Sequence, residues 1–183
     1  MALQPLSAGR RADLHIRRLC EQDAVAYRAL RLRALAEHPE AFTSSAEEEA
    51  GKPLQWSAKR ITAAADRPHD LFLGAFEEHA LLGMVGMVGR YRPKERHNAS
   101  VVGMYVASEV AGRGVGAALL QALIEQARAM PELEQLDLTV TDGNDRARSI
   151  YTRGGFTEYG ALPRAIKVAG RYHGKVHMVL RLR

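Results

Sequence analysis

The chain has 183 residues, 46% of them hydrophobic, and its 26 Lys and Arg exceed its 21 Asp and Glu, for a net charge of +5. A chain of this length and composition suits one domain with a sizeable core. No window approaches the roughly eighteen apolar residues of a membrane span, and the N-terminus lacks the apolar core of a signal peptide. We therefore expect a cytoplasmic protein without membrane contact.

The ionisable residues exclude other classes. A single cysteine, Cys20, rules out an intrachain disulfide, and its place after an alternating run predicts a small buried side chain. The seven histidines show no paired ligand spacing, so we expect no metal site. The basic residues are dispersed and not interleaved with aromatic residues, which argues against nucleic acid as a partner and leaves a small polyanionic ligand.

The N-terminal region predicts a tail, a strand and a helix. We expect residues 1–12 to be disordered and residues 13–183 to form a single domain. Asp13–Leu19 alternates apolar and polar residues, as a half-buried strand does. Asp23 is placed to cap a helix that runs to about Glu37, and Pro39 ends it.

A capping box and a hairpin are predicted next. Ser45 and Glu48 have the spacing of a capping box, and a further helix is expected over Pro53–Ala65. The apolar runs Leu71–Phe76 and Ala80–Val88 flank a short polar turn, which predicts an antiparallel hairpin. Glycines within the second run indicate a bulge.

The C-terminal half alternates strands and helices. A strand ending at Val106 precedes a helix that runs to about Met130, and the strand Leu136–Thr141 precedes a short helix over Asn144–Arg153, which Asn144 can cap. Three short strands follow, at Phe156–Tyr159, Ile166–Ala169 and Lys175–Leu182. The predicted fold is α/β, with a mixed sheet in the order β-α-α-β-β-β-α-β-α-β-β-β and helices on its faces.

The most informative segment joins the strand at Val101–Val106 to the following helix. Gly112, Gly114 and Gly116 allow left-handed or closely approached backbone, so successive N–H groups can converge on an anion. The N-terminus of the helix adds unpaired N–H groups and the positive end of its dipole, and Arg113 adds a charge. The pattern predicts a phosphate-binding loop; a flexible turn before a helix is the plainer alternative.

Two common phosphate-binding motifs account for this loop less well. A P-loop would need Gly-Lys-Ser/Thr after the glycines, and that sequence is missing. Gly112, Gly114 and Ala117 satisfy the spacing of the dinucleotide fingerprint. Its context differs, however, because Asp137 begins the next apolar run instead of ending it, and over a hundred residues precede the glycines.

The loop resembles motif A of the GNAT-type N-acetyltransferase superfamily. Met104-Tyr105-Val106 matches the strand end of that motif, and Ala111–Gly116 matches its loop, with Ala111 in place of the family's Gln or Arg. Downstream, Asn144-x-x-Ala147-x-x-Ile150-Tyr151-x-x-Gly154-Gly155-Phe156 resembles motif B of the same superfamily. The two motifs occur in the family's order, and the resemblance extends from about Leu14 to Leu182.

The resemblance implies a binding site for acetyl-CoA as co-substrate, with no metal. In this family the strands before and after the motif A helix splay apart, the pantetheine arm lies in the gap, and a backbone N–H near Val106 contacts the thioester. The residues that the resemblance assigns to cofactor binding are Met104, Tyr105, Val106, Ala111, Gly112, Arg113, Gly114, Val115, Gly116, Ala117 and Asn144.

Acetyl transfer to an amine needs a base for the attacking nitrogen and an acid for the departing thiolate. The resemblance places Tyr151 as that acid, and a phenol of ordinary pKa stays protonated at pH 7; packing against the sheet is its structural alternative. The strand before the loop carries no acidic residue. A water chain is one way to supply the base, and the residues that could serve are Glu47, Glu48, Glu49, His97, Glu109 and Glu158.

Three functions follow from the sequence. The favoured one is an N-acetyltransferase that acts on a primary amine of a small molecule, peptide or protein, with an acceptor pocket shaped by residues 42–56 and 163–172. The second is an acyl-CoA-binding regulator without turnover, and the third a dinucleotide-binding oxidoreductase. The sequence leaves open the identity of the acceptor and whether the protein forms a homodimer.

Overall fold

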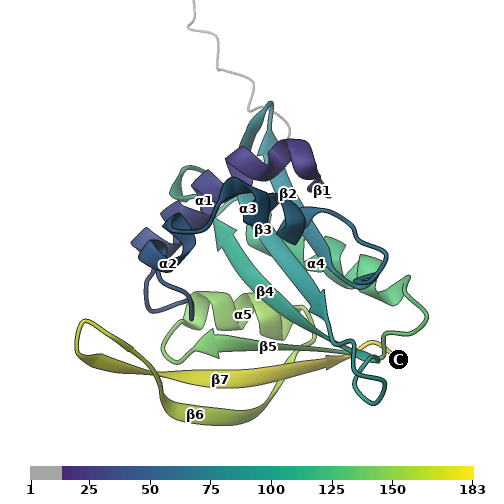
Figure 1. The fold of residues 1–183 in the computed structure, drawn as a ribbon. Coiled ribbons are helices and arrows are strands. Elements are labelled where there is room, and N and C mark those ends of the chain that lie inside the picture. The colour runs from purple at the N-terminus through teal and green to yellow at the C-terminus, as the bar shows by residue number, and fades with distance from the viewer. Residues whose placement is uncertain (1–13) are drawn as a thin grey trace, which may run out of the picture.

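The computed structural model describes residues 14–183 and contains a seven-stranded sheet in the order β1-β2-β3-β4-β5-β7-β6 (Figure 1). Neighbouring strands are antiparallel except for β4 and β5, which are parallel. The strands are β1 Leu14–Arg18, β2 Leu71–Glu77, β3 Ala80–Gly89, β4 Asn98–Val106, β5 Gln135–Thr141, β6 Thr157–Val168 and β7 Arg171–Arg181. The predicted mixed α/β fold is confirmed.

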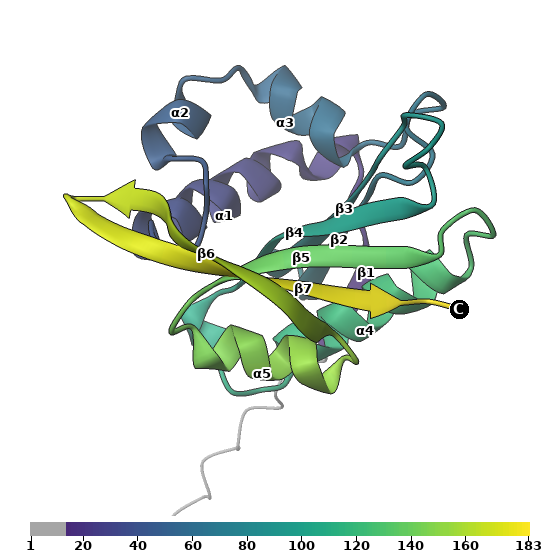
Figure 2. The same ribbon diagram turned by 90° about the horizontal axis from the view of Figure 1, so that it is seen from below.

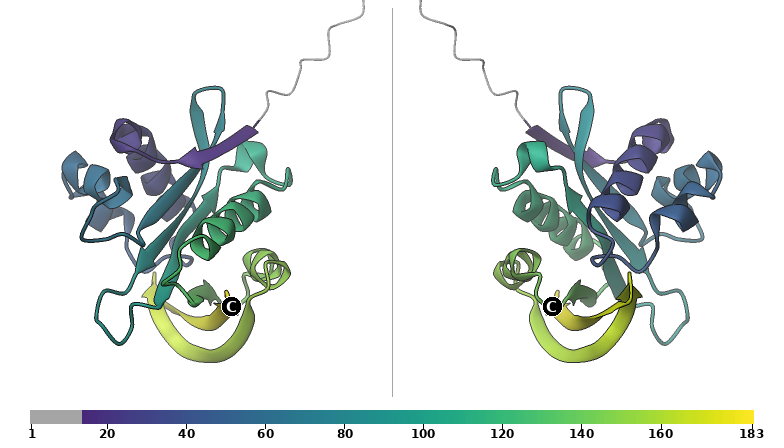
Figure 3. Two further views of the ribbon diagram at one scale, coloured as in Figure 1. Left: turned by 90° about the vertical axis from the view of Figure 1, so that its right-hand side faces the viewer. Right: turned by 90° about the vertical axis from the view of Figure 1, so that its left-hand side faces the viewer.

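Helices cover both faces of the sheet. They are α1 Ala24–Glu37, α2 Ala46–Ala50, α3 Leu54–Ile61, α4 Val115–Arg128 and α5 Asp145–Arg153. Helices α1 to α3 lie on one face and α4 and α5 on the other (Figures 2 and 3). Each face has its own apolar cluster, one containing Leu119 and Leu123 of α4, the other Tyr27 and Leu30 of α1. The sheet therefore lies between two apolar clusters, and a ligand that contacts both faces of the sheet must pass between strands.

The parallel pair β4 and β5 provides that passage. Only Asn98–Ser100 of β4 pairs with β5, so the strands separate beyond Ser100, as predicted. Toward β3, the register changes between Met84 and Gly86, where β4 advances three residues and β3 only two. The extra residue is accommodated near Gly103, whose φ of +64° favours glycine, and such a bulge bends the strand. A second register shift lies at the start of β3, as its glycines indicated.

The C-terminal strands differ from the prediction. Phe156–Tyr159 and Ile166–Ala169 were expected to be separate strands, but the single strand β6 spans both, and β7 begins at Arg171 instead of Lys175. Pro163 lies within this strand, where the pairing with β7 shifts between Leu162 and Ile166. A proline cannot donate a backbone hydrogen bond, and it is tolerated there because β6 is the edge strand of the sheet and the pairing is interrupted at this point.

Two predictions near the start of α1 are also corrected. Asp23 occupies the N-cap position of α1 but does not cap it; its carboxylate accepts hydrogen bonds from the Cys20 N–H at 2.9 Å and from both terminal nitrogens of Arg17 at 2.7 and 2.8 Å. Cys20 is exposed, and the buried position is that of Leu19. The hydrogen bonds from Arg17 lower the pKa of Asp23.

Other helix boundaries agree more closely. The capping box of Ser45 and Glu48 is present, and Asn144 caps α5 by accepting a hydrogen bond from the Ala147 N–H at 3.1 Å. Helix α3 ends at Ile61, earlier than the predicted Ala65. The predicted tail of residues 1–12 lies outside the described residues.

Candidate active site

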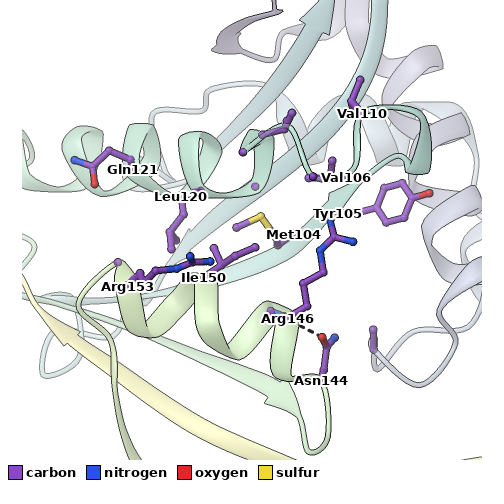
Figure 4. A pocket seen from close by; sticks show the side chains of 18 of the residues that line it. Met104, Tyr105, Val106, Val110, Leu120, Gln121, Asn144, Arg146, Ile150 and Arg153 are labelled. Carbon is purple, nitrogen blue, oxygen red and sulfur yellow. Dashed lines mark hydrogen bonds between the residues drawn. The ribbon is translucent and has the colours of Figure 1, made fainter.

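A cavity of about 740 Å³ lies where β4 and β5 separate, between α4, α5 and the loop after α1 (Figure 4). We call the part that the glycine loop, α4 and α5 line its α4 side; the residues there are Val110, Gly112, Gly114, Val115, Gly116, Ala117, Leu120, Gln121, Asn144, Arg146, Ala147, Ile150, Arg153 and Gly154. The α1 side is lined by His38, Ala41, Phe42 and Tyr105. Met104 and Val106 of β4 line the cavity between the two.

The glycine loop leaves a group of backbone N–H donors without partners. Gly112 and Gly114 both have a φ of +79°, and Gly114 is the N-cap of α4. The first hydrogen bond that enters the helix runs from the Ala118 N–H to the Gly114 carbonyl, at 3.0 Å. Among the described residues, no acceptor is found for the N–H groups that we call the cradle: those of Gly112, Gly114, Val115, Gly116 and Ala117.

The cradle divides the predicted loop residues into two groups. All five cradle residues line the cavity, whereas Ala111 and Arg113 do not. The N–H groups of these two are already used: Ala111 donates to the Ser108 carbonyl at 3.1 Å, and Arg113 to the Val110 carbonyl at 3.3 Å. Ala111 and Arg113, which the resemblance assigns to cofactor binding, therefore lie outside the cradle.

The Arg113 side chain is also directed elsewhere. Its guanidinium donates to the Glu77 carboxylate at 2.9 Å, at the end of β2. Arg146 and Arg153 of α5 line the cavity instead and form no salt bridge with any described residue, unlike Arg148, which pairs with Glu158. Neither arginine was predicted as a site residue from the sequence, although their spacing at i and i+7 on a predicted helix places them on one face.

The two facing helices also supply apolar walls. Leu120 of α4 and Ile150 of α5 point toward one another across the cavity, and Arg146 extends toward the end of β4 (Figure 4). Gly116 has ordinary helical backbone, but a Cβ at this position would lie 3.2 Å from Ile150 Cδ1. A glycine at this position therefore allows α4 and α5 to approach closely; no left-handed backbone is involved.

Tyr151 does not line the cavity, although its neighbour Ile150 does. Its ring is buried in the apolar cluster between α4 and the sheet and packs edge-on against Phe156, with the ring centroids 6.1 Å apart. Among the described residues, the hydroxyl has no hydrogen-bond partner. Burial raises the pKa of Tyr151 to about 12, so the phenol stays protonated. The geometry explains its packing, and its role as acid stays a prediction.

Tyr105 points to the opposite face of the sheet from its neighbours. Side chains alternate along a strand. Met104 and Val106 therefore pack with the apolar cluster under α4, and Tyr105 packs with the apolar cluster under α1. The Tyr105 hydroxyl donates to Glu37 Oε2 at 2.5 Å. Burial, together with this carboxylate, raises the pKa of Tyr105 to about 12, and the phenol lowers the pKa of Glu37.

The loop after α1 is fixed to the sheet by a buried lysine. Lys175 Nζ donates to the carbonyls of Glu40 at 3.3 Å and Ala41 at 2.9 Å, and to Thr141 Oγ1 at 2.7 Å. The Thr141 hydroxyl donates in turn to the Glu40 carbonyl at 2.8 Å. Burial lowers the pKa of Lys175. These bonds tie the loop that carries Ala41 and Phe42 to β5 and β7, so the α1 wall is positioned by side chains distant in sequence.

None of the six residues considered as a base lines the cavity. Glu47 and Glu48 are exposed on α2, and His97 lies beside Asn98, where β4 begins. The others are in salt bridges: Glu49 with Lys52, Glu109 with Arg33 and Glu158 with Arg148. Residues 163–172 also contribute nothing to the lining, and from 42–56 only Phe42 does.

The arrangement of residues 14–183 also bears on other kinds of site. In this part of the chain no three His, Cys, Asp or Glu side chains come together as metal ligands. None of the helices described is long and apolar enough to cross a membrane. The sheet is antiparallel except at β4 and β5, whereas dinucleotide-binding folds have a mostly parallel sheet. The oxidoreductase hypothesis therefore lacks the fold it requires.

Comparison with known families agrees with this geometry. The sequence pattern of the acetyltransferase (GNAT) family matches residues 31–156, more than half of the chain. The chain belongs to this family. The match includes the glycine loop, α4 and α5, and so the whole cavity lining on the α4 side. The resemblance inferred from the two motifs is confirmed.

Two similar acetyltransferases match this chain over only part of their own length. An N-acetyltransferase of Streptomyces griseus is 34% identical over 125 residues, which are 65% of this chain and 61% of that protein. The L-methionine sulfoximine/L-methionine sulfone acetyltransferase of Pseudomonas aeruginosa is 35% identical over 95 residues, 51% of this chain and 55% of the relative. In both, the match spans less than two-thirds of the relative.

Solved structures extend the likeness of fold to nearly the whole chain. The YncA protein of Salmonella typhimurium, solved with its cofactor acetyl-CoA, has a TM-score of 0.77 over 94% of this chain and 95% of that one. The sequences are 21% identical, so the comparison concerns the fold alone.

Proposed function

We propose that this protein transfers an acetyl group from acetyl-CoA to a primary amine. The observation that carries the proposal is the cradle: five backbone N–H groups without partners, at the N-terminus of a fourteen-residue helix, lining a cavity at the gap between β4 and β5. Such a helix end favours phosphate groups. The relatives named above are acetyltransferases, which supports the same reaction.

The α4 side fits the phosphate-rich part of coenzyme A. The cradle offers uncharged donors to the pyrophosphate, and the positive end of the α4 dipole favours anions. Arg146 and Arg153 add two positive charges that no described carboxylate neutralises. Gly112 and Gly114, with φ of +79°, keep side chains away from this surface. The fit rests on this chain's own donors and charges.

The gap beyond Ser100 fits the extended arm of the cofactor. Backbone groups of β4 that would pair with a neighbouring strand are not paired with β5 from Val101 to Val106. They can hydrogen-bond an extended ligand in the manner of an added strand. Bound acetyl-CoA supplies the activated thioester, and a backbone N–H near Val106 would stabilise negative charge on its carbonyl oxygen.

The two sides of the cavity divide the remaining tasks. The α1 side, with Ala41, Phe42 and Tyr105, would receive the acceptor amine. Tyr151 would protonate the departing thiolate through its unpartnered hydroxyl, which requires the hydroxyl to turn toward the gap.

The proposal is tested by binding and by turnover. We expect calorimetry to give dissociation constants of roughly micromolar to submillimolar for acetyl-CoA and coenzyme A and no binding of NAD. Thiol release from acetyl-CoA, followed across a panel of polyamines, amino acids, aminoglycosides and peptide N-termini, should then identify an acceptor, and mass spectrometry should find the acetylated amine. Binding of NAD without coenzyme A would overturn the proposal; tight coenzyme A binding with no acceptor would favour the acyl-CoA-binding regulator.

A further inference from the structure

Few side chains that line the cavity can exchange a proton. Among the described lining residues, the ionisable side chains are His38, Tyr105, Arg146 and Arg153. Arginine stays protonated in proteins and cannot act as a base. His38 and Tyr105 remain, and both belong to the α1 side. The proton acceptor that the strand before the glycine loop lacks is therefore to be sought across the sheet.

Tyr105 is arranged to orient a donor, not to take its proton. Its hydroxyl hydrogen is committed to Glu37, whose other carboxylate oxygen accepts from Arg33 Nε at 2.7 Å. Arg33 is fixed in turn by both carboxylate oxygens of Glu109, at 2.6 and 2.8 Å. The phenol oxygen keeps a lone pair for an N–H donor in the cavity. Its direction is set by this chain of bonds.

His38 is the better proton acceptor. It is the C-cap of α1, and its ring centroid lies 6.1 Å from that of Tyr105. Its Nδ1 lies 3.8 Å from Glu40 Oε1, so a carboxylate faces one ring nitrogen, and the residue lines the cavity. The carbonyl of Glu40 is held by Lys175 and Thr141. An imidazole can gain and lose a proton near neutral pH.

The remaining charges around His38 are few. Glu37 precedes it on α1, Glu40 follows it in the loop, and Tyr105 faces it from β4. Arg146 of α5 lines the same cavity, and the ammonium of Lys175 on β7 contacts the main chain of the loop. The carboxylates of Glu37, one residue before His38, and of Glu40, two residues after it, favour a cationic acceptor beside the ring.

We propose that His38 is the general base for the acceptor amine and that Tyr105, held by Glu37, orients the amine. This inference rests on the proposed function. One N–H bond of the bound ammonium breaks, its proton moves to a ring nitrogen of His38, and the electron pair stays on the amine nitrogen. The nitrogen bonds to the thioester carbon as the C–S bond breaks. The amide nitrogen loses its surplus proton to solvent, and the thiolate gains one from Tyr151 or solvent.

The test compares pH profiles of kcat at saturating acetyl-CoA and amine, which report groups in the bound complex. In the wild-type protein, kcat should fall toward acidic pH, because a general base acts only in its unprotonated form. His38→Asn should lower kcat by about a hundredfold or more, abolish that acid limb and leave the dissociation constant of coenzyme A unchanged. Added imidazole should restore part of the activity of His38→Ala. His79→Asn, in the exposed turn between β2 and β3, is the matched control and should behave as wild type.

Glu37→Gln separates positioning from catalysis. Because it acts through Tyr105, it should raise KM for the amine several-fold more than it lowers kcat, and the acid limb should persist. If His38→Asn kept the wild-type kcat and acid limb, the inference would be overturned while the transferase assignment stood. If the wild-type protein acetylated no amine, the proposed function itself would fail.

Discussion

The α4 side and the α1 side of the cavity are built from different materials. The cradle is main chain from one short segment, Gly112 to Ala117, and its donors are free because a helix begins there. The α1 side consists of side chains from the C-cap of α1, the loop that follows and β4, and Lys175 of β7 holds that loop. A backbone site of this kind leaves a compact pattern in the sequence, whereas a side-chain site assembled from distant elements does not.

The same contrast separates binding from selectivity. Backbone donors bind a group common to all coenzyme A derivatives, and few substitutions can alter them without changing the fold. Side chains such as His38, Phe42 and Tyr105 can change singly, so the α1 side is where acceptor preference can differ between relatives. Substitutions on the two sides should accordingly affect different constants.

The largest effect should come from the cradle. Gly114→Val places a β-branched side chain at a φ of +79°, where a Cβ meets no protein atom within 4 Å but occupies the space in front of the cradle. We expect calorimetry to detect no coenzyme A binding. Gly170→Val is the matched control, since its φ is +80°, its surroundings are equally open, and it lies in the turn between β6 and β7. Equal loss of affinity in both variants would assign the effect to backbone strain.

Tyr151→Phe should act on turnover alone. Loss of a general acid typically costs about 10²–10⁴-fold, and because a thiolate leaves more readily than an alkoxide we expect about a hundredfold. Phenylalanine keeps the packing on Phe156 and removes a hydroxyl that has no partner, so thermal stability should not fall. Steady-state kinetics with saturating acetyl-CoA are the measurement, with exposed Tyr159→Phe as control. Wild-type turnover in Tyr151→Phe would leave it a packing residue.

Lys175→Met should weaken the α1 side without affecting the cradle. It removes the donor to the Ala41 carbonyl and to Thr141 Oγ1, and leaves the Glu40 carbonyl with the Thr141 hydroxyl as its donor, which we expect to lower the free energy of unfolding by about 1–3 kcal/mol. KM for the amine should rise while the dissociation constant of coenzyme A stays constant. Denaturant unfolding and kinetics would be compared with Lys167→Met, an exposed lysine on β6. A change in coenzyme A affinity alone would contradict the separation of the two sides.

The smallest effect concerns single charges. Arg153→Ala removes from the cavity wall a cation that pairs with no carboxylate of residues 14–183, and should weaken coenzyme A binding by about threefold to tenfold, more at low salt than at high salt. Arg113→Ala should leave the affinity nearly unchanged because its guanidinium is paired with Glu77 outside the lining. Calorimetry at two salt concentrations distinguishes them, and a larger loss in Arg113→Ala would reverse the assignment.

Much of the fold and of the α4 side could be predicted because the signals are local. Glycines between an apolar strand and an amphipathic helix specify the cradle, and Asn144 at a cap position specifies the start of α5. The strand β6 was divided wrongly because Pro163 normally interrupts a strand, and its place at the sheet edge is a tertiary property.

The α1 side could not be predicted for a related reason. The bond between Tyr105 and Glu37 joins residues 68 positions apart, and the bond between Lys175 and Ala41 joins residues 134 apart. No periodicity or spacing records such pairs. Even within the glycine loop, the partners of the Ala111 and Arg113 N–H groups depend on a short 3₁₀ turn at Ser108–Val110 that the glycine pattern does not encode.

The most direct test of the cradle is a crystal structure of this protein with coenzyme A bound. The pyrophosphate oxygens should accept hydrogen bonds from two or more N–H groups among Gly112 and Gly114–Ala117, with the N–H groups of Ala111 and Arg113 still bonded to the Ser108 and Val110 carbonyls. The account would be contradicted by a pyrophosphate held only by Arg146 and Arg153, with the five N–H groups facing water.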